Sequence, residues 1–208
     1  MTNDFEMAAL FPCPVYITTR DSDLDLTEEK EIEDIIKAGL REDGDRNHHT
    51  ENTYIFDTSL KNLKEFCEHH VKNYVKEILN AEEELDFYIT QSWVNVVEPG
   101  GNIHRHQHSN SIISGCFYIS TENDDTVVFN DPNRTSKLQV EPNEYNDWNS
   151  TACHFPATNN RLLLFPSWLE HEVMPNESAT TKRISLSFNT FAKGIFGNRN
   201  ALNNLILK

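Results

Sequence analysis

The chain has 208 residues, which is enough for one domain with a substantial hydrophobic core. It carries 18 Lys and Arg against 33 Asp and Glu, a formal net charge of −15, which argues against nucleic acid or an anionic membrane surface as a partner. No apolar run reaches the length of a membrane span and the acidic start is unlike a signal peptide, so we expect a cytoplasmic protein.

The first part of the chain predicts an extended segment, a helix and a loop. Residues 10–17 contain two prolines, and because proline donates no ladder hydrogen bond they indicate an edge strand or an extended lead-in. Thr27 can cap a helix whose apolar residues recur at helical spacing. The polar residues 42–52 then predict a loop in which His48 and His49 are solvated.

A second helix is predicted over residues 59–80. Apolar side chains recur there three and four positions apart, and the opposite face is charged. A helix with one apolar stripe needs a surface to cover, so we expect both helices to pack on the outside of a sheet.

From residue 85 onward the sequence is rich in β-branched and aromatic residues. It predicts extended segments at residues 87–97, 112–120, 126–129, 161–165, 168–174 and 182–191. Residues 130–160 hold prolines and many Asn and Asp, which predicts a long excursion that acts as a mobile lid. We therefore expect one domain, with a helical lead-in over about 1–84, a β core over about 85–191 and a C-terminal extension over 192–208, whose last eight residues are too short to classify.

Three histidines at alternate positions, His104, His106 and His108, precede the segment at 112–120. In an extended chain, side chains two apart point to the same side of a sheet, about 6–7 Å apart at the backbone. Two neutral imidazoles placed in this way can bind one divalent ion. On geometry alone, His104 with His106 and His106 with His108 are equally good pairs.

A third ligand and an anion-binding group follow later in the chain. His171 comes shortly after an aromatic residue and a proline on a short extended segment, which suits a rigid, partly buried site. The segment from Arg183 to Asn189 is two-faced, with Arg183, Ser185, Ser187 and Asn189 on one side and apolar residues on the other. That polar side is either solvent-facing or lines a cavity where Arg183 binds a carboxylate, with Ser185 adding a hydroxyl donor.

Together these motifs resemble the iron(II)- and 2-oxoglutarate (2OG)-dependent oxygenases, and more narrowly their small 2OG-Fe(II) oxygenase branch related to the prolyl-hydroxylase-like enzymes. The resemblance rests on His-x-His before Ser-Gly-x-x-Tyr, on Phe-Pro-Ser-Trp-Leu-x-His-x-Val, and on Arg-x-Ser, and it covers roughly residues 88–191. It implies a mainly β fold with flanking helices, a double-stranded β-helix (a distorted, cupin-like jelly roll) with the N-terminal helices packed outside.

The resemblance also implies a site and a reaction. Its metal ligands and catalytic residues fall on His106, His108 and His171, and its 2OG-binding residues on Arg183 and Ser185. Iron(II) and 2OG are the implied cofactors, and the family allows ascorbate as an accessory reductant. The implied reaction is hydroxylation of a C–H bond coupled to decarboxylation of 2OG to succinate.

Tyr118 and Asn95 lie on segments expected to face the same cavity. We hold them as further cosubstrate contacts, although a buried Tyr or Asn is often satisfied by neighbouring backbone instead.

One departure from the family keeps alternatives open. The usual facial triad has two histidines and a carboxylate, and here His108 occupies the carboxylate position. A cupin-like three-histidine enzyme that does not use 2OG and a non-catalytic metal-binding β-domain are therefore alternatives. The sequence does not distinguish a small-molecule substrate from a peptidyl side chain. It also allows a homodimer.

Overall fold

The computed structural model describes residues 6–81, 85–133, 140–198 and 200–208. Its helical elements are α1 (Leu26–Ala38), the 3-10 turn η1 (Ile55–Asp57), α2 (Lys61–Tyr74) and the π-helical turn η2 (Val75–Leu79). Its strands are β1 (Tyr16–Thr19), β2 (Leu40–Glu42), β3 (Asn47–Thr50), β4 (Asp86–Val97), β5 (Ile103–His106), β6 (Ile113–Ser120), β7 (Thr126–Asn130), β8 (Ala152–Pro156), β9 (Arg161–Pro166), β10 (His171–Val173), β11 (Arg183–Phe196) and β12 (Leu205–Leu207). None of the helices in these ranges combines the length and apolar composition needed to cross a bilayer.

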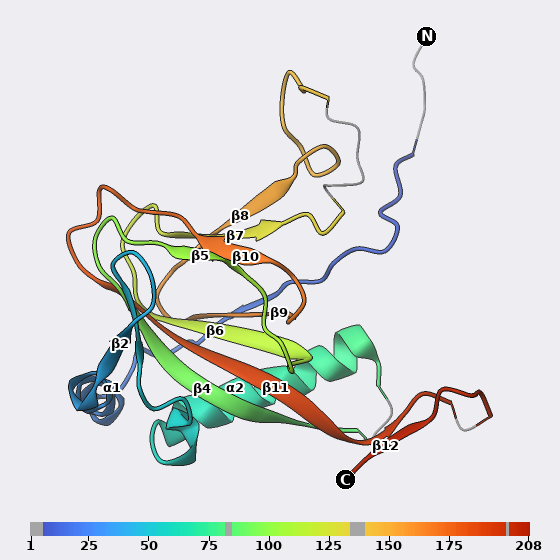
Figure 1. The fold of residues 1–208 in the computed structure, drawn as a ribbon, viewed down its shortest axis with the longest axis horizontal. Coiled ribbons are helices and arrows are strands. Elements are labelled where there is room, and N and C mark those ends of the chain that lie inside the picture. The colour runs from blue at the N-terminus through green and yellow to red at the C-terminus, as the bar shows by residue number, and fades with distance from the viewer. Residues whose placement is uncertain (1–5, 82–84, 134–139, 199) are drawn as a thin grey trace.

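Two antiparallel sheets face each other and enclose the interior of the molecule (Figure 1). The large sheet has the strand order β1-β9-β6-β11-β4-β3-β2, and β12 pairs with the end of β11. The small sheet has the order β5-β10-β7-β8. The ladders between these strands are antiparallel. This arrangement confirms the predicted jelly roll, the double-stranded β-helix.

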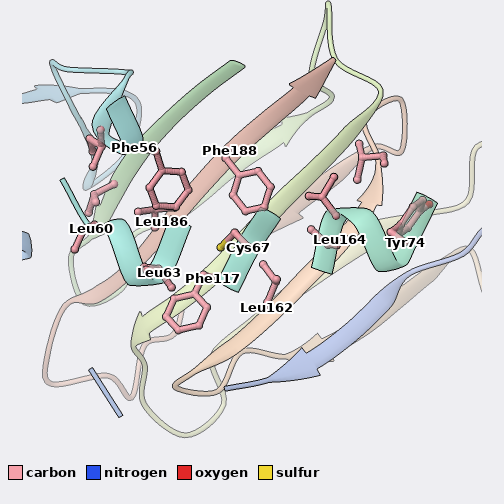
Figure 2. Packing of buried hydrophobic residues seen from close by; sticks show 14 of the residues in the cluster. Phe56, Leu60, Leu63, Cys67, Tyr74, Phe117, Leu162, Leu164, Leu186 and Phe188 are labelled. Atoms are coloured by element: carbon pink, nitrogen blue, oxygen red, sulfur yellow. The ribbon is translucent and has the colours of Figure 1, made fainter. Parts of the chain in front are cut away.

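The helices cover the outer face of the large sheet, as the amphipathic pattern predicts. In Figure 2, helix α2 lies across the sheet with Leu63, Cys67 and Tyr74 turned toward it. The sheet meets them with the apolar side chains of Phe117, Leu162, Leu164, Leu186 and Phe188. The predicted helix over 59–80 is confirmed, and its last residues form the π-helical turn η2.

Helix α1 begins one residue before the predicted cap. Its N-cap is Asp25, whose carboxylate accepts the backbone N–H groups of Thr27 and Glu28 at 2.8 and 2.9 Å. The Glu28 side chain in turn accepts the backbone N–H of Asp25, which completes a capping box. The prediction that Thr27 caps the helix was wrong because Asp25 satisfies two N–H groups at once.

The strands of the large sheet alternate sharply between helix-facing and interior-facing residues. In β9, Leu162 and Leu164 pack against the helices, and Leu163 and Phe165, which alternate with them, belong to the interior cluster. In β6, Gly115 lies opposite Phe188 of β11, and a Cβ on Gly115 would stand 2.1 Å from the Phe188 ring. Glycine here therefore lets the phenylalanine ring lie flat against the neighbouring strand.

Two segments predicted as loops contain strands. Strand β3 lies inside the predicted loop 42–52, forms a hairpin with β2 and pairs with β4, so His48 and His49 are half-buried rather than solvated. Strand β8 lies inside the predicted excursion 130–160 and pairs with β7. Both were missed because their sequences, Asn-His-His-Thr and Ala-Cys-His-Phe-Pro, lack the apolar alternation of a strand with one buried face. Residues 134–139 of the predicted lid lie outside the described residues.

Segments near both ends of the chain contribute strands to the large sheet. β1, β2 and β3 come from the predicted helical lead-in, and β1 is an edge strand, as the prolines before it indicated. β11 continues to Phe196 and β12 pairs with its end, so part of the predicted C-terminal extension continues the sheet.

Candidate metal centre

Three histidines, one each from β5, the loop after it and β10, meet at the interior side of the small sheet. His106 is the last residue of β5, His108 follows two residues later, and His171 is the first residue of β10. β10 pairs with β5 so that His171 lies directly opposite His106. One ring nitrogen of each lies within 4.8 Å of the others, a spacing that can hold a metal ion. His104 is exposed and does not belong to this group, although its ring centroid is 5.5 Å from that of His106.

Each of the three imidazoles is anchored through its Nδ1 atom. The Nδ1 atoms of His106 and His171 bond the backbone carbonyls of His104 and Leu169, at 2.8 and 2.9 Å. The Nδ1 of His108 bonds Oδ1 of Asn189, at 2.6 Å. Since these oxygens only accept, each Nδ1 carries the proton and each Nε2 keeps a free lone pair.

The Nε2 lone pairs of these rings repel each other and would be stabilised by a shared cation. Nε2 of His108 and Nε2 of His171 are 3.3 Å apart. Two acceptors at this distance with no proton between them repel, and a shared divalent ion removes the repulsion. The donor set therefore fits a metal ion by its own chemistry.

The protonation states agree with this reading. Burial, reinforced by the charges of neighbouring histidines, lowers the pKa of His171 to about 3 and that of His108 to about 4. Burial also lowers the pKa of His106. All three rings are therefore neutral at neutral pH, which is the form that binds metal.

A cavity between the two sheets joins the histidines to Arg183. Its lining includes all three rings, together with Trp93, Asn95, Cys116, Tyr118, Phe165, Arg183, Ser185 and Ser187. The polar side of β11 faces inward, so the sequence alternative of a solvent-facing Arg183 is wrong. Arg183 is only 6% exposed, and its Nη2 atom has no hydrogen-bond partner among the described residues. Its Nη1 atom has one long contact, 3.5 Å from the carbonyl of Thr126.

A buried guanidinium nitrogen without a partner is costly, and a carboxylate in the cavity would satisfy it. The same enclosed space thus offers metal-binding nitrogens and an anion-binding group. A small molecule that carries two acidic groups would use both.

The predicted cosubstrate contacts Ser185, Tyr118 and Asn95 all line this cavity. The Asn95 side chain already forms hydrogen bonds with protein groups. Its Oδ1 accepts from Trp93 Nε1 at 3.1 Å and its Nδ2 donates to Ser187 Oγ at 3.0 Å. Burial raises the pKa of Tyr118 well above its usual value, so its phenol stays protonated. Tyr118 therefore keeps a hydroxyl proton, Ser185 lies beside the Cys116 thiol, and Asn95 instead holds the Trp93 ring.

Two functional neighbours were not singled out from the sequence. Asn189 anchors His108 and also accepts a hydrogen bond from Ser114 Oγ at 3.2 Å. Its place on the polar side of the Arg183 strand was the available signal. Trp93 stacks on His108, with ring centroids 5.7 Å apart, and its alternation with Asn95 on β4 could have indicated that position.

Comparison with protein families gives one match, to a model described as "Putative 2OG-Fe(II) oxygenase". It covers residues 91–189, just under half of the 208-residue chain, and includes all three histidines and Arg183. This match confirms the resemblance that the motifs indicated. A search of curated proteins found no match.

Solved structures with similar folds include three 2OG-dependent or related proteins. The carbocyclase SnoK from nogalamycin biosynthesis, described as non-heme and alpha-ketoglutarate-dependent, has a TM-score of 0.61 at 12% identity, over 88% of this chain and 82% of SnoK. A prolyl hydroxylase from Trichoplax adhaerens, in complex with a hypoxia inducible factor peptide fragment, has a TM-score of 0.60 at 15% identity, over 85% and 83%. HygX from Streptomyces hygroscopicus, with nickel, 2-oxoglutarate and hygromycin B bound, has a TM-score of 0.56 at 8% identity, over 86% and 82%. At these identities the likeness establishes the fold.

Proposed function

We propose, from the match of residues 91–189 to a 2OG-Fe(II) oxygenase family model, that this protein is an iron(II)- and 2OG-dependent dioxygenase. Its reaction would hydroxylate a C–H bond of a substrate while 2OG is decarboxylated to succinate. The observation that carries the proposal is the shared cavity, in which three metal-competent Nε2 atoms and the unpartnered Nη2 of Arg183 face one space.

His106, His108 and His171 would hold the iron, and Arg183 with Ser185 would hold the far carboxylate of 2OG. When bound, iron and 2OG together supply the oxidising chemistry. The protein would position the reactants and exclude water. The Nδ1 hydrogen bonds would fix the three rings, and Arg183 would fix the cosubstrate. The apolar walls at Phe165 and Trp93 would limit the entry of water.

The site differs from the usual facial triad at His108. A neutral imidazole in place of a carboxylate leaves one more unit of positive charge on the metal and its ligands, which strengthens binding of a dianionic cosubstrate. A cupin-like metal enzyme without 2OG would also use three histidines. The buried, unpartnered Arg183 in the same cavity favours the acidic cosubstrate, because such an enzyme has no need of it.

The substrate class is a small molecule or a peptidyl side chain. Proteins of this fold include one solved with a peptide and one solved with hygromycin B. Both classes therefore remain within the proposal.

Turnover of 2OG tests the proposed function directly. Purified protein with iron(II), 2OG and air should form succinate, measured by mass spectrometry, even slowly and without substrate. The His108→Ala and Arg183→Leu variants should lose this activity, and His104→Ala, outside the cluster, should keep it. Succinate formation that is absent in the iron-loaded wild-type protein, or equal in all four proteins, would contradict the proposal and leave a non-catalytic metal-binding domain.

A further inference from the structure

A second pocket lies beside the metal centre and opens to the surface. It has a volume of about 310 Å³, which suits a small molecule or a single side chain. Trp93, His106 and His108 line both this pocket and the cavity that contains Arg183, and Arg183 and Ser185 line only the latter. A molecule in the second pocket would therefore meet the metal-binding rings without occupying the anion-binding part of the cavity.

Most of the side chains that line this pocket carry hydrogen-bonding groups. Apart from Trp93 and the two metal-site histidines, it consists of Asp43, His49, Thr53, Gln91, Gln107 and Asn189. Every one of these side chains can form hydrogen bonds, and none is aliphatic. Ligand pockets are usually lined mainly by apolar side chains, so this composition indicates a polar ligand.

The strongest groups in the pocket are acceptors. Among the lining residues only Asp43 carries a formal charge when the histidines are neutral, and its carboxylate forms no hydrogen bond or ion pair with any residue that the structure describes. The Nδ1 of His49 bonds the backbone carbonyl of Thr50 at 2.9 Å, so its Nε2 is an acceptor when the ring is neutral. A carboxylate and an imidazole lone pair together select a donor-rich group.

Asp43 is held in place by the β2–β3 hairpin. Its backbone N–H donates to the carbonyl of Asn47 at 2.9 Å, and the Asn47 side chain returns a bond to the carbonyl of Asp43 at 3.0 Å. The turn also contacts the residue that follows β4, since the carbonyl of Arg46 accepts the N–H of Glu98 at 2.8 Å. The hairpin therefore holds the backbone at Asp43, and its exposed side chain lines the pocket together with the metal-site rings.

We propose that this pocket binds the primary substrate and that Asp43 anchors a cationic amine or guanidinium group of it, leaving a nearby C–H bond next to the metal centre. This inference rests on the proposed function and narrows its substrate to a cationic small molecule or a basic side chain. The chain's net charge of −15 agrees with it, because the long-range field attracts cations.

The test uses three small probes of matched shape, namely butylamine (cationic), butyramide (neutral) and butyrate (anionic). Binding of each to the full-length protein loaded with cobalt(II) is measured by ligand-observed NMR titration. Relaxation of the probe protons by the cobalt ion then reports whether the bound probe lies beside the metal. Butylamine should bind most tightly of the three and should be relaxed by the metal.

Variants at the hairpin separate a built site from general charge. Asp43→Asn should weaken butylamine binding by roughly two- to fivefold, the range for a partly exposed charge pair, and Asp43→Lys should reverse the preference toward butyrate. Glu42→Gln is the matched control, because the neighbouring Glu42 carboxylate is also exposed but does not line the pocket, and its loss changes the net charge equally. This control should bind butylamine as the wild type does.

The outcomes distinguish this inference from the proposed function. Butylamine binding that does not exceed butyramide binding, that is unaffected by Asp43→Asn, or that falls equally in Glu42→Gln would overturn the inference while cobalt and 2OG binding stay intact. Failure of the wild-type protein to bind cobalt(II) would instead appear in the metal titration, before any probe is added, and would overturn the proposed function together with the inference.

Discussion

At the scale of single residues, the metal centre depends on which nitrogen of each histidine is free. The alternation of His104, His106 and His108 is visible in the sequence, and so is His171. The geometry that favours His106 with His108 appears only in the fold, because the His108 ring lies beside His171 whereas His104 is exposed. The sequence places Asn189 on the polar side of the Arg183 strand, but its contact with His108 depends on how this distant strand aligns with the loop that carries His108.

Substitution of the ligands gives the first prediction. Alanine at His106, His108 or His171 should abolish stoichiometric binding of cobalt(II), whereas His104→Ala should retain it. Asn189→Leu should weaken metal binding by about 10- to 100-fold, because it removes the acceptor that orients His108. Metal titration followed by visible absorption measures all five variants. An empty site in His104→Ala with a filled site in His108→Ala would show that the other histidine pair binds the metal.

Arg183 gives the second prediction. Arg183→Leu should weaken 2OG binding by roughly 2–4 kcal/mol, the usual loss when a desolvated charge pair loses one partner, and should leave metal binding intact. The free energy of unfolding should stay constant or rise, because leucine removes a buried and partly unsatisfied charge.

Calorimetry with an inert divalent ion in place of iron measures the 2OG affinity. Lys182→Leu is the matched control, since that neighbouring cation is exposed and pairs with Glu98 outside the cavity. Equal affinities in Arg183→Leu and the wild type would remove the cosubstrate role.

The buried histidines make stability depend on pH in the metal-free protein. His108 and His171 have folded-state pKa values of about 4 and about 3, below the ordinary value of 6.5, so between these limits the unfolded chain binds more protons. The free energy of unfolding should therefore fall as pH drops from 6.5 toward 4, by up to about 1.4 kcal/mol per pH unit for each histidine.

Urea denaturation at a series of pH values measures this dependence. His108→Gln should reduce the slope, and the exposed His104→Gln should not. A slope that is the same in all three proteins would show that the cluster does not carry the pH dependence.

At the scale of elements, the sequence predicts those strands and helices that have one apolar face. Strands β4, β6, β9 and β11 follow their predicted segments because each buries one face under the helices. β3 and β8 escape prediction because both lie toward sheet edges and carry polar side chains. The hairpin that holds Asp43 is thus the part of the candidate substrate pocket that sequence periodicity could not reveal. That residues 130–160 act as a lid stays a prediction.

The contact between β6 and β11 gives a prediction at this scale. Gly115→Ala should destabilise the protein by about 1–3 kcal/mol, because the added methyl group would overlap the Phe188 ring. Adding Phe188→Leu to this variant should recover part of the loss, since the smaller side chain leaves room for the methyl group. Thermal or urea unfolding of the single and double variants measures the effect. Additive losses in the double variant would show that the two residues do not compete for the same space.

At the scale of the whole molecule, the fold separates stability from chemistry. The helices and the outer face of the large sheet form one apolar cluster, and the inner faces of both sheets form the cavity. The architecture could be predicted from the motif resemblance, because His-x-His, the distal histidine and Arg-x-Ser fix which faces turn inward. The cavity's extent and the second pocket could not, because they depend on how two sheets from distant segments approach each other.

The central claim is that one cavity holds a metal ion and 2OG together. Anaerobic titration of the protein with iron(II) and then 2OG tests it most directly, with the visible charge-transfer band of the iron–2OG chelate as the signal. We predict that the band appears only when both are present, is lost in His171→Ala, and requires higher 2OG concentrations in Arg183→Leu. No band in the wild-type protein at saturating iron and 2OG, or a band of equal strength and midpoint in all three proteins, would contradict the claim.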